Sequence, residues 1–271
     1  MSGSFLESNV IFQEIYCVLA GSKYAGQGCS AQGILPVGYD WIGFFIAGFA
    51  IMFILANAFM LGAAVFVYSE RRLLGKFQLR TGPNRVGPFG LLQPIADILK
   101  LLMKEDIVPN GADKPVHTLA PIVMLAPAIL VTAVIPFGSG YFLTDLNVGL
   151  LYIIAVSGMI TIAIFMAGWS CNNRYALFGS MRGVAQLVSY EVPMVLSIVG
   201  VLLFVGSLSM VDIVERQFVP FILVQPLGFL IFFIAISAEM NRSPFDIVEA
   251  DSELVAGFHT EYSGMKWGTF Q

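Results

Sequence analysis

The chain alternates long apolar runs with shorter polar segments. Each apolar run has about 20 or more mostly apolar residues, the length that a helix needs to cross the hydrocarbon core of a bilayer. The pattern therefore predicts five transmembrane helices. They are expected at residues 42–68, 116–136, 148–169, 183–208 and 220–238.

The polar segment 70–115 contains a helix pattern of its own. After the turn-rich stretch TGPNRVGPFG, the polar residues Gln93, Asp97, Lys100 and Lys104 recur at steps of four, three and four, with leucines and isoleucine on the opposite side. About 14 helical residues reach only about 21 Å, which is too short to cross a membrane. The pattern predicts an amphipathic helix that lies in the interface or packs at the mouth of a cavity. A merely peripheral anchor is the open alternative.

Composition agrees with a membrane protein. The 271 residues are 57% hydrophobic and 12% charged, whereas soluble domains carry about 25% charged residues. The predicted fold class is an all-α integral membrane protein, with five transmembrane helices, the amphipathic helix and an acidic cytoplasmic helix-loop. The net charge of −4 does not indicate a nucleic-acid partner. The chain contains neither GxGxxG before a helix nor GxxxxGK[ST], so no nucleotide site is expected on it.

Basic residues predict the orientation of the helices. Twelve of the 14 Lys and Arg lie in segments 70–115, 170–182 and 239–271, and the other two are Lys23 and Arg216. These two groups alternate across the five predicted spans. Because loops rich in Lys and Arg stay on the cytoplasmic side, the N-terminus is expected outside, and the basic loops are expected in the cytoplasm or an organelle matrix.

Residues 1–40 are read as an N-terminal extension to which no role is assigned, and residues 41–271 as one membrane domain. No basic segment precedes an apolar core near the N-terminus, so a secretory signal is not expected. Cys17 and Cys29 either form a disulfide in an oxidising compartment or remain free thiols. The cysteines have no metal-binding spacing, and His117 and His259 stand alone, so no metal site is predicted.

The segment following the fifth predicted span concentrates acidic residues around a single base, Arg242. Their spacing would place several on one helix face, but Pro244 cannot sit inside a regular helix. Ser243 is expected to cap a new helix, along which Asp246 and two later acids form a stripe. The acidic residues are Glu239, Asp246, Glu249, Asp251, Glu253 and Glu261.

Carboxylates placed so close together repel one another, which raises the pKa of some of them toward neutrality, above all where they are partly buried. Groups coupled in this way are able to pass protons at physiological pH. An ordinary solvated acidic face is the alternative. The scarcity of balancing bases and the apolar residues between the acids favour the proton-passing interpretation.

Glu191 lies inside the fourth predicted span, near its cytoplasmic end. A carboxylate at such a depth costs about 2.5–3.5 kcal/mol and usually faces a polar interior. Gln186, Ser189 and Tyr190 are candidate hydrogen-bond partners for it. The alternative is that Glu191 extends its side chain to the interface. Glu70 ends the first span beside two arginines, where a surface ion pair is the simpler interpretation.

Three long stretches resemble one family, the H-type membrane protein of respiratory complex I, the proton-pumping NADH:quinone oxidoreductase. They are SERRLLGKFQLRTGPNRVGPFGLLQPIADILKLLMKED, NNRYALFGSMRGVAQLVSYEV and AEMNRSPFDIVEADSELVAGFHTEYSGMKW. The resemblance extends from about residue 42 to the end of the chain.

The resemblance implies a membrane protein that forms much of a quinone chamber, entered from the bilayer, and that couples quinone reduction to proton translocation. It implies a quinone-binding group of Glu70, Arg71, Arg80, Asp97 and Arg242. It also implies a proton or charge relay of Glu191, Glu239, Asp246, Glu249, Asp251, Glu253 and Glu261. FMN and iron–sulfur clusters would lie on partner subunits, which include hydrophilic quinone-site subunits and antiporter-like membrane subunits. The implied location is the inner or plasma membrane of a bacterium, or the mitochondrial inner membrane.

Other functions remain open at this stage. Members of the family usually have eight spans, whereas this chain ends where the sixth is expected, so the resemblance implies a C-terminally short member. A homologous subunit of a membrane-bound hydrogenase would share these features, because the electron donor binds elsewhere. An independent proton-coupled carrier is expected to have repeated halves, which we do not find in the sequence. A protein that serves only as a structural membrane anchor would not need a carboxylate such as Glu191 inside a transmembrane span.

Overall fold

The computed structural model describes residues 10–20, 40–138, 144–242, 244–248 and 257–270. Within these residues the fold is all-α, as predicted, and four helices are long and apolar enough to cross a membrane. They are α3 (Asp40–Phe77), α5 (Lys114–Thr132), α6 (Gly149–Ser170) and α7 (Arg174–Val205), and they correspond to the first four predicted spans.

The fifth predicted span is divided into two helices. The short helix α9 (Phe221–Val224) precedes α10 (Pro226–Glu239), and Gln225 between them has the non-helical angles φ −133° and ψ 67°. Pro226 causes this break, because proline has no amide hydrogen and disfavours helical geometry in the residue before it. The 14 residues of α10 extend about 21 Å.

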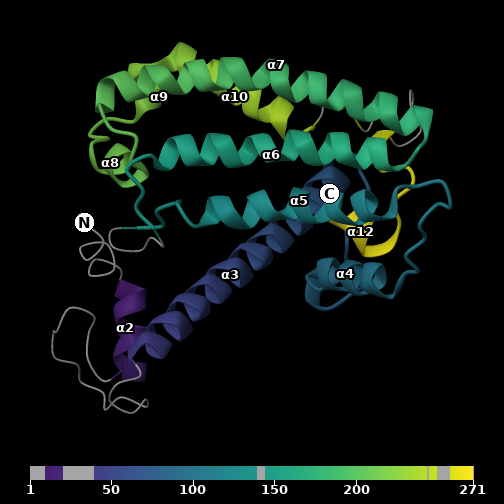
Figure 1. Cartoon of the computed structure of the whole chain (residues 1–271), viewed down its shortest axis with the longest axis horizontal. Coiled ribbons are helices and arrows are strands. Elements are labelled where there is room, and N and C mark those ends of the chain that lie inside the picture. Colours follow the sequence, from purple (N-terminus) through teal and green to yellow (C-terminus); the bar gives the residue numbers. More distant parts are fainter. Residues whose placement is uncertain (1–9, 21–39, 139–143, 243, 249–256, 271) are drawn as a thin grey trace.

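Helices α5, α6 and α7 lie side by side, and α10 packs against α7 (Figure 1). The short helices α2 (Val10–Ala20) and α8 (Met210–Glu215) lie at one end of this bundle. The amphipathic helix α4 (Gln93–Met103) and α12 (Gly264–Gly268) lie at the other end (Figure 1). The predicted cytoplasmic segments therefore meet at the same end of the bundle.

Helix α3 lies beside the bundle, inclined to α5, and approaches α5 towards the end of α3 (Figure 1). Its 38 residues extend about 57 Å, well beyond a hydrocarbon core of about 30 Å. Near its start, α2 packs against it through a buried cluster of Phe12, Tyr16, Ala47 and Ile51. Cys17 of α2 is disulfide-bonded, which excludes the free-thiol alternative for this residue.

Helix α4 has the amphipathic character that its spacing predicts. Ile95, Leu99 and Leu102 are exposed on its apolar side, while Gln93 and Asp97 on its polar side are partly buried. The turn that leads into α4 depends on Gly90, which has a φ of +79° and lies so close to Pro83 that a Cβ would approach its carbonyl oxygen to 2.3 Å. The exposed apolar side of α4 is suited to contact with lipid.

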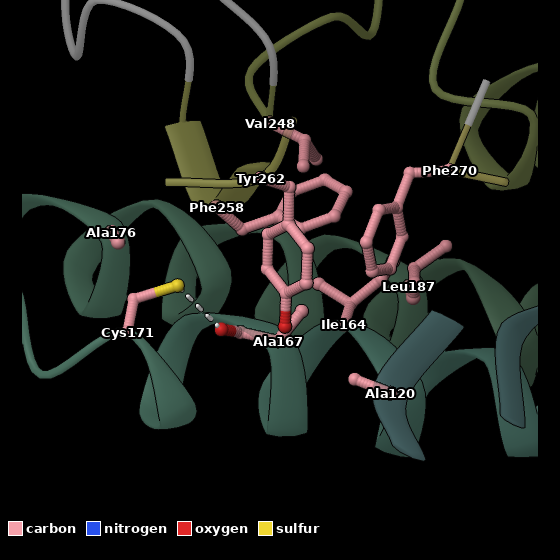
Figure 2. Close-up of a cluster of buried hydrophobic side chains, with 10 residues drawn as sticks. All are labelled: Ala120, Ile164, Ala167, Cys171, Ala176, Leu187, Val248, Phe258, Tyr262 and Phe270. Carbon is pink, nitrogen blue, oxygen red and sulfur yellow. Dashed lines mark hydrogen bonds between the residues drawn. The ribbon is translucent and has the colours of Figure 1, made fainter. Parts of the chain in front are cut away.

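The main buried cluster fixes the last described segment on the bundle (Figure 2). Tyr262 and Phe258 each place their ring edge-on to Phe270, with centroids 4.8 and 5.3 Å apart. These rings pack with Ile164 of α6 and Leu187 of α7. The cluster therefore holds residues 257–270 at the same end of α6 and α7 as α4.

The segment that follows α10 differs partly from its prediction. Helix α10 ends at Glu239, earlier than the break expected at Ser243 and Pro244. The predicted helix beginning at Pro244 is wrong for residues 244–248, which form turns. The capping residue Ser243 and the later acids of the predicted stripe lie outside the described residues.

Candidate functional site

An ion pair joins the end of the first span to the segment after α10. Arg242 donates from Nη1 to Oε1 of Glu70, at 2.7 Å. The two residues are 172 positions apart in the sequence. The pair is partly exposed, with 61% of the Arg242 side chain and 44% of the Glu70 side chain accessible. Solvent therefore weakens it, and its importance lies in which segments it brings together.

A second ion pair joins the same end of α3 to the amphipathic helix. Arg71 donates to Asp97 of α4, which also accepts from Gln93 at 3.2 Å and faces Lys100 at 3.7 Å. Partial burial alone would raise the pKa of Asp97. Its hydrogen bonds with Arg71 and Gln93 and the charges of Arg71 and Lys100 outweigh burial and lower that pKa below its ordinary value.

Three segments thus meet at the inner end of α3. Because Glu70 and Arg71 are consecutive, one turn of helix contacts both the amphipathic helix and the segment after α10. Tyr68 adds a third link, since its hydroxyl donates to the carbonyl oxygen of Phe89 at 2.8 Å. Four of the five predicted quinone-binding residues belong to this group. The fifth, Arg80, instead donates to Gln78 at 2.6 Å within the turn after α3.

Two of the predicted relay residues lie close together on neighbouring helices. Glu239 at the end of α10 is near enough to Glu191 of α7 to interact with its charge. Both side chains are partly buried. Glu191 also lies against α6, where a Cβ on Gly158 would be 3.4 Å from its Oε1. The carboxylate of Glu191 is therefore packed directly against α6.

The expected partners of Glu191 make other contacts. Gln186 is 7% exposed, and its Nε2 donates to the carbonyl oxygens of Ala238 at 2.8 Å and Phe245 at 2.9 Å. Ser189 donates to a carbonyl of its own helix, and the ring of Tyr190 packs edge-on to Phe245. Gln186 therefore fixes both ends of the turn around Arg242, rather than supporting Glu191.

Glu261 is held at the start of α7. Its Oε1 accepts from Nδ2 of Asn173 at 2.8 Å, while Oδ1 of the same asparagine caps α7 by accepting from the amide of Tyr175. A single side chain thus caps the helix and positions the carboxylate. Glu261 is therefore bound to Asn173, whereas Glu191 and Glu239 interact with each other. Within the described residues, the predicted relay residues do not form one connected group.

Tyr262, the residue after Glu261, is packed into the bundle. Its ring stacks on that of His117 with centroids 4.0 Å apart, and its hydroxyl lies 3.1 Å from Oγ of Ser170. Burial raises the pKa of Tyr262 to about 12, an effect that the hydrogen bond with Ser170 opposes in part. The phenol is therefore neutral throughout the physiological range. His117 is fully buried.

The remaining predicted relay residues have no established geometry. Asp246 is exposed, and Glu249, Asp251 and Glu253 lie outside the described residues. Within the described ranges, no three His, Cys, Asp or Glu side chains gather to hold a metal ion.

Sequence reasoning missed the residues that position the charges. Asn173, Ser170 and Tyr68 are polar residues near helix ends, where capping is common, but nothing in their spacing identifies a partner about 20 to 90 positions away. The sequence marks Gln186 only as a candidate partner for Glu191. Its position inside an apolar helix was the available signal, because a buried amide needs hydrogen-bond partners.

Comparison with known proteins gives the family of the chain. Residues 49–271 match the family described as NADH dehydrogenase. The chain is 60% identical to the H subunit of the NADH-quinone oxidoreductase of Dehalococcoides mccartyi strain CBDB1 over 217 residues, which are 80% of this chain and 62% of that protein. It is 51% identical to the corresponding H subunit of Bacillus cytotoxicus over 243 residues, which are 88% of this chain and 72% of that protein. The chain thus spans 62% of the length of the D. mccartyi relative. These matches establish that the chain belongs to the NADH dehydrogenase family, among the H subunits of NADH-quinone oxidoreductases.

Proposed function

We propose that the chain is the quinone-chamber subunit of a proton-translocating NADH:quinone oxidoreductase. The observation that carries the proposal is the meeting of α3, α4 and the segment after α10 through the pairs Glu70–Arg242 and Arg71–Asp97. Charges on three separate segments are rarely assembled at a membrane surface without a role, since each isolated pair adds little stability.

The quinone-binding group comprises Glu70, Arg71, Arg80, Asp97 and Arg242. Quinone is a largely apolar substrate with two carbonyl oxygens, which accept hydrogen bonds. Arginine guanidinium groups supply donors for them, and the exposed apolar side of α4 supplies a surface along which an apolar tail enters from the bilayer. Conversion to quinol adds two electrons and two protons, so charged and proton-bearing groups are needed near the headgroup.

The relay group comprises Glu191, Glu239, Asp246, Glu249, Asp251, Glu253 and Glu261. The electrostatic interaction of Glu239 with Glu191 supports this assignment, because a relay needs carboxylates that respond to one another's charge. A change of charge near Arg242, three residues after Glu239, is therefore communicated to a carboxylate inside the α7 span. In this way the reduction of quinone changes proton occupancy within the membrane.

The assembly requires partners that this chain does not supply. The electrons come from FMN and iron–sulfur clusters on partner subunits, through a hydrophilic subunit that contributes to the quinone site. Antiporter-like membrane subunits continue the proton path. Quinone is the substrate bound by this chain, and the surrounding bilayer contacts the exposed apolar helices.

We place the N-terminus outside and the α4 end in the cytoplasm or matrix. The excess of Lys and Arg on the α4 side supports this orientation. The disulfide at Cys17 supports it independently, because disulfides persist in oxidising compartments such as the bacterial periplasm. The membrane is then a bacterial inner or plasma membrane, or the mitochondrial inner membrane.

Substitution of Glu191 tests the proposed relay. We expect Glu191→Gln to reduce NADH-driven proton translocation by at least about ten-fold in native membranes, while the amount of assembled complex is unchanged. The control is Glu215→Gln, because Glu215 lies in α8 at the opposite end of the bundle. Full proton translocation in Glu191→Gln would exclude a relay through this residue.

A further inference from the structure

The short helix α12 packs against the end of α4. A Cβ on Gly264, at the start of α12, would come within 3.1 Å of the carbonyl oxygen of Lys104, and a Cβ on Gly268 within 3.0 Å of Cδ1 of Leu101. Gly264 also has a φ of +58°, which glycine adopts without strain. The backbone of α12 therefore lies directly against the last turn of α4 and the residue that follows it.

Polar contacts hold the segment that follows α4. Ser263 accepts a hydrogen bond at Oγ from the amide of Ile107 at 2.8 Å and donates to the carbonyl oxygen of Glu105 at 3.2 Å. Nζ of Lys266 lies 2.7 Å from Oδ2 of Asp106. Because only 20% of the Lys266 side chain is accessible, solvent screens this pair less than it screens a fully exposed pair. Three consecutive residues after α4 are therefore each bound by α12 or by the residue that precedes it.

Helix α12 is itself fixed to the bundle. Trp267 packs against the main buried cluster, and Phe270, two residues after α12, belongs to that cluster (Figure 2). The contacts of α12 hold the end of α4, whereas the ion pair between Arg71 and Asp97 holds the first half of α4 to α3. Two separate attachments determine the direction of a helix. The loss of the α12 contacts would therefore allow α4 to turn about its contact with α3.

We propose that Ser263 and Lys266 are positioning residues for the quinone site, which hold α4 so that Asp97 and the apolar side of the helix are placed to bind the substrate. The inference rests on the function proposed above. Asp106 follows Asp97 by nine residues, so Lys266 acts through α4 and not by contact with the group around Asp97. Displacement of α4 weakens the binding of quinone equally before and during its reduction. It should therefore raise KM for quinone and leave kcat unchanged.

Kinetics of the complete complex in native membranes test the proposal. The added substrate is a ubiquinone with a single isoprene unit, and rates are expressed per bound flavin. Lys266→Glu replaces the attraction to Asp106 with repulsion and should raise KM for this quinone at least about three-fold at unchanged kcat. Adding Asp106→Lys restores opposite charges and should return KM to the wild-type value. An unchanged KM in Lys266→Glu, or no recovery in the double variant, would overturn the proposal.

Two further variants separate positioning from a purely structural role. Lys104→Glu makes the same change of charge at an exposed lysine at the end of α4 and should leave KM unchanged, whereas an equal rise of KM in this control would contradict the proposal. Ser263→Ala is a milder change and should raise KM in the same direction even where Lys266→Glu prevents assembly. A lower amount of flavin-containing complex with a normal KM in Ser263→Ala and Lys266→Glu would show that the two residues support only the fold, and would also contradict the proposal.

Wild-type kinetics distinguish a failure of this inference from a failure of the proposed function. Wild-type membranes in which the complex has no NADH:quinone activity would refute the proposed function and the inference with it. Normal wild-type activity together with an unchanged KM in the variants would refute the inference alone.

Discussion

Substitution of Gln186 gives the most direct test of how the segment after α10 is held. In Gln186→Leu, the carbonyl oxygens of Ala238 and Phe245 lose their side-chain donor. Each buried acceptor left unpaired costs about 1–3 kcal/mol. The turn that carries Arg242 is therefore expected to open more readily, which weakens the contact of Arg242 with Glu70.

The magnitude follows from three buried groups. The Phe245 carbonyl oxygen, left unpaired, costs about 2 kcal/mol, whereas that of Ala238 keeps the amide of Asn241 at 3.2 Å and loses only about 1 kcal/mol, which gives about 3 kcal/mol together. Against this, Oε1 of Gln186 is itself buried without a partner within the described residues, so its removal recovers about 2 kcal/mol. The net destabilisation of about 1 kcal/mol corresponds to a roughly five-fold increase in the population of the open turn.

Hydrogen exchange read by mass spectrometry measures this opening, because exchange of protected amides follows local unfolding. The amide of Phe245, which donates to the carbonyl oxygen of Arg242, should exchange roughly five-fold faster in Gln186→Leu. Ser189→Ala is the matched control on the same helix, since Ser189 is exposed and its hydroxyl donates to Ala185 of that helix. Unchanged exchange at Phe245 in Gln186→Leu would refute the reasoning.

Three further predictions concern single groups. The pKa of the Asp97 carboxyl is lowered, so the ionised carboxylate stabilises the α3–α4 contact fully above the ordinary pKa of 3.8. This stabilisation is lost as pH falls through the lowered pKa, and hydrogen exchange of α4 should then become faster. Asp97→Asn should remove this increase of exchange at acid pH. Tyr262→Phe keeps the ring but loses the bond to Ser170, so thermal stability should fall by about 1 kcal/mol, whereas an unchanged midpoint would contradict that bond. Burial raises the pKa of Cys171 to about 11, so iodoacetamide should alkylate it at about pH 8 only after denaturation, and rapid labelling of the folded protein would show that the thiol is accessible.

The sequence predicts the helices well, because the length of an apolar run and the spacing of polar residues along a helix can both be read within one segment of the chain. The first four spans and α4 follow from run length and from the steps between Gln93, Asp97 and Lys100. The division at Gln225 was missed because the apolar run continues through it, although Pro226 was the available signal. The helix expected from Pro244 is wrong over 244–248, since a proline permits a helix start without requiring one.

The contacts of the site depend on packing that no local pattern records. Glu70 and Arg71 are both expected near the chamber, but nothing local assigns Glu70 to Arg242 and Arg71 to Asp97. The expectation that Gln186 supports Glu191 is wrong for the same reason. Proximity along α7 suggests Gln186, whereas its amide binds the backbone carbonyls of Ala238 in α10 and Phe245 after α10.

The central claim is that this chain works within an NADH:quinone oxidoreductase, and purification from its native membrane tests it most directly. The tagged chain should be isolated under mild conditions and assayed for bound flavin, bound iron and NADH:quinone activity. The account predicts that all three copurify with the chain. Iron–sulfur clusters without flavin or NADH activity would indicate a hydrogenase-type complex instead, and a chain that carries none of the three would contradict the account.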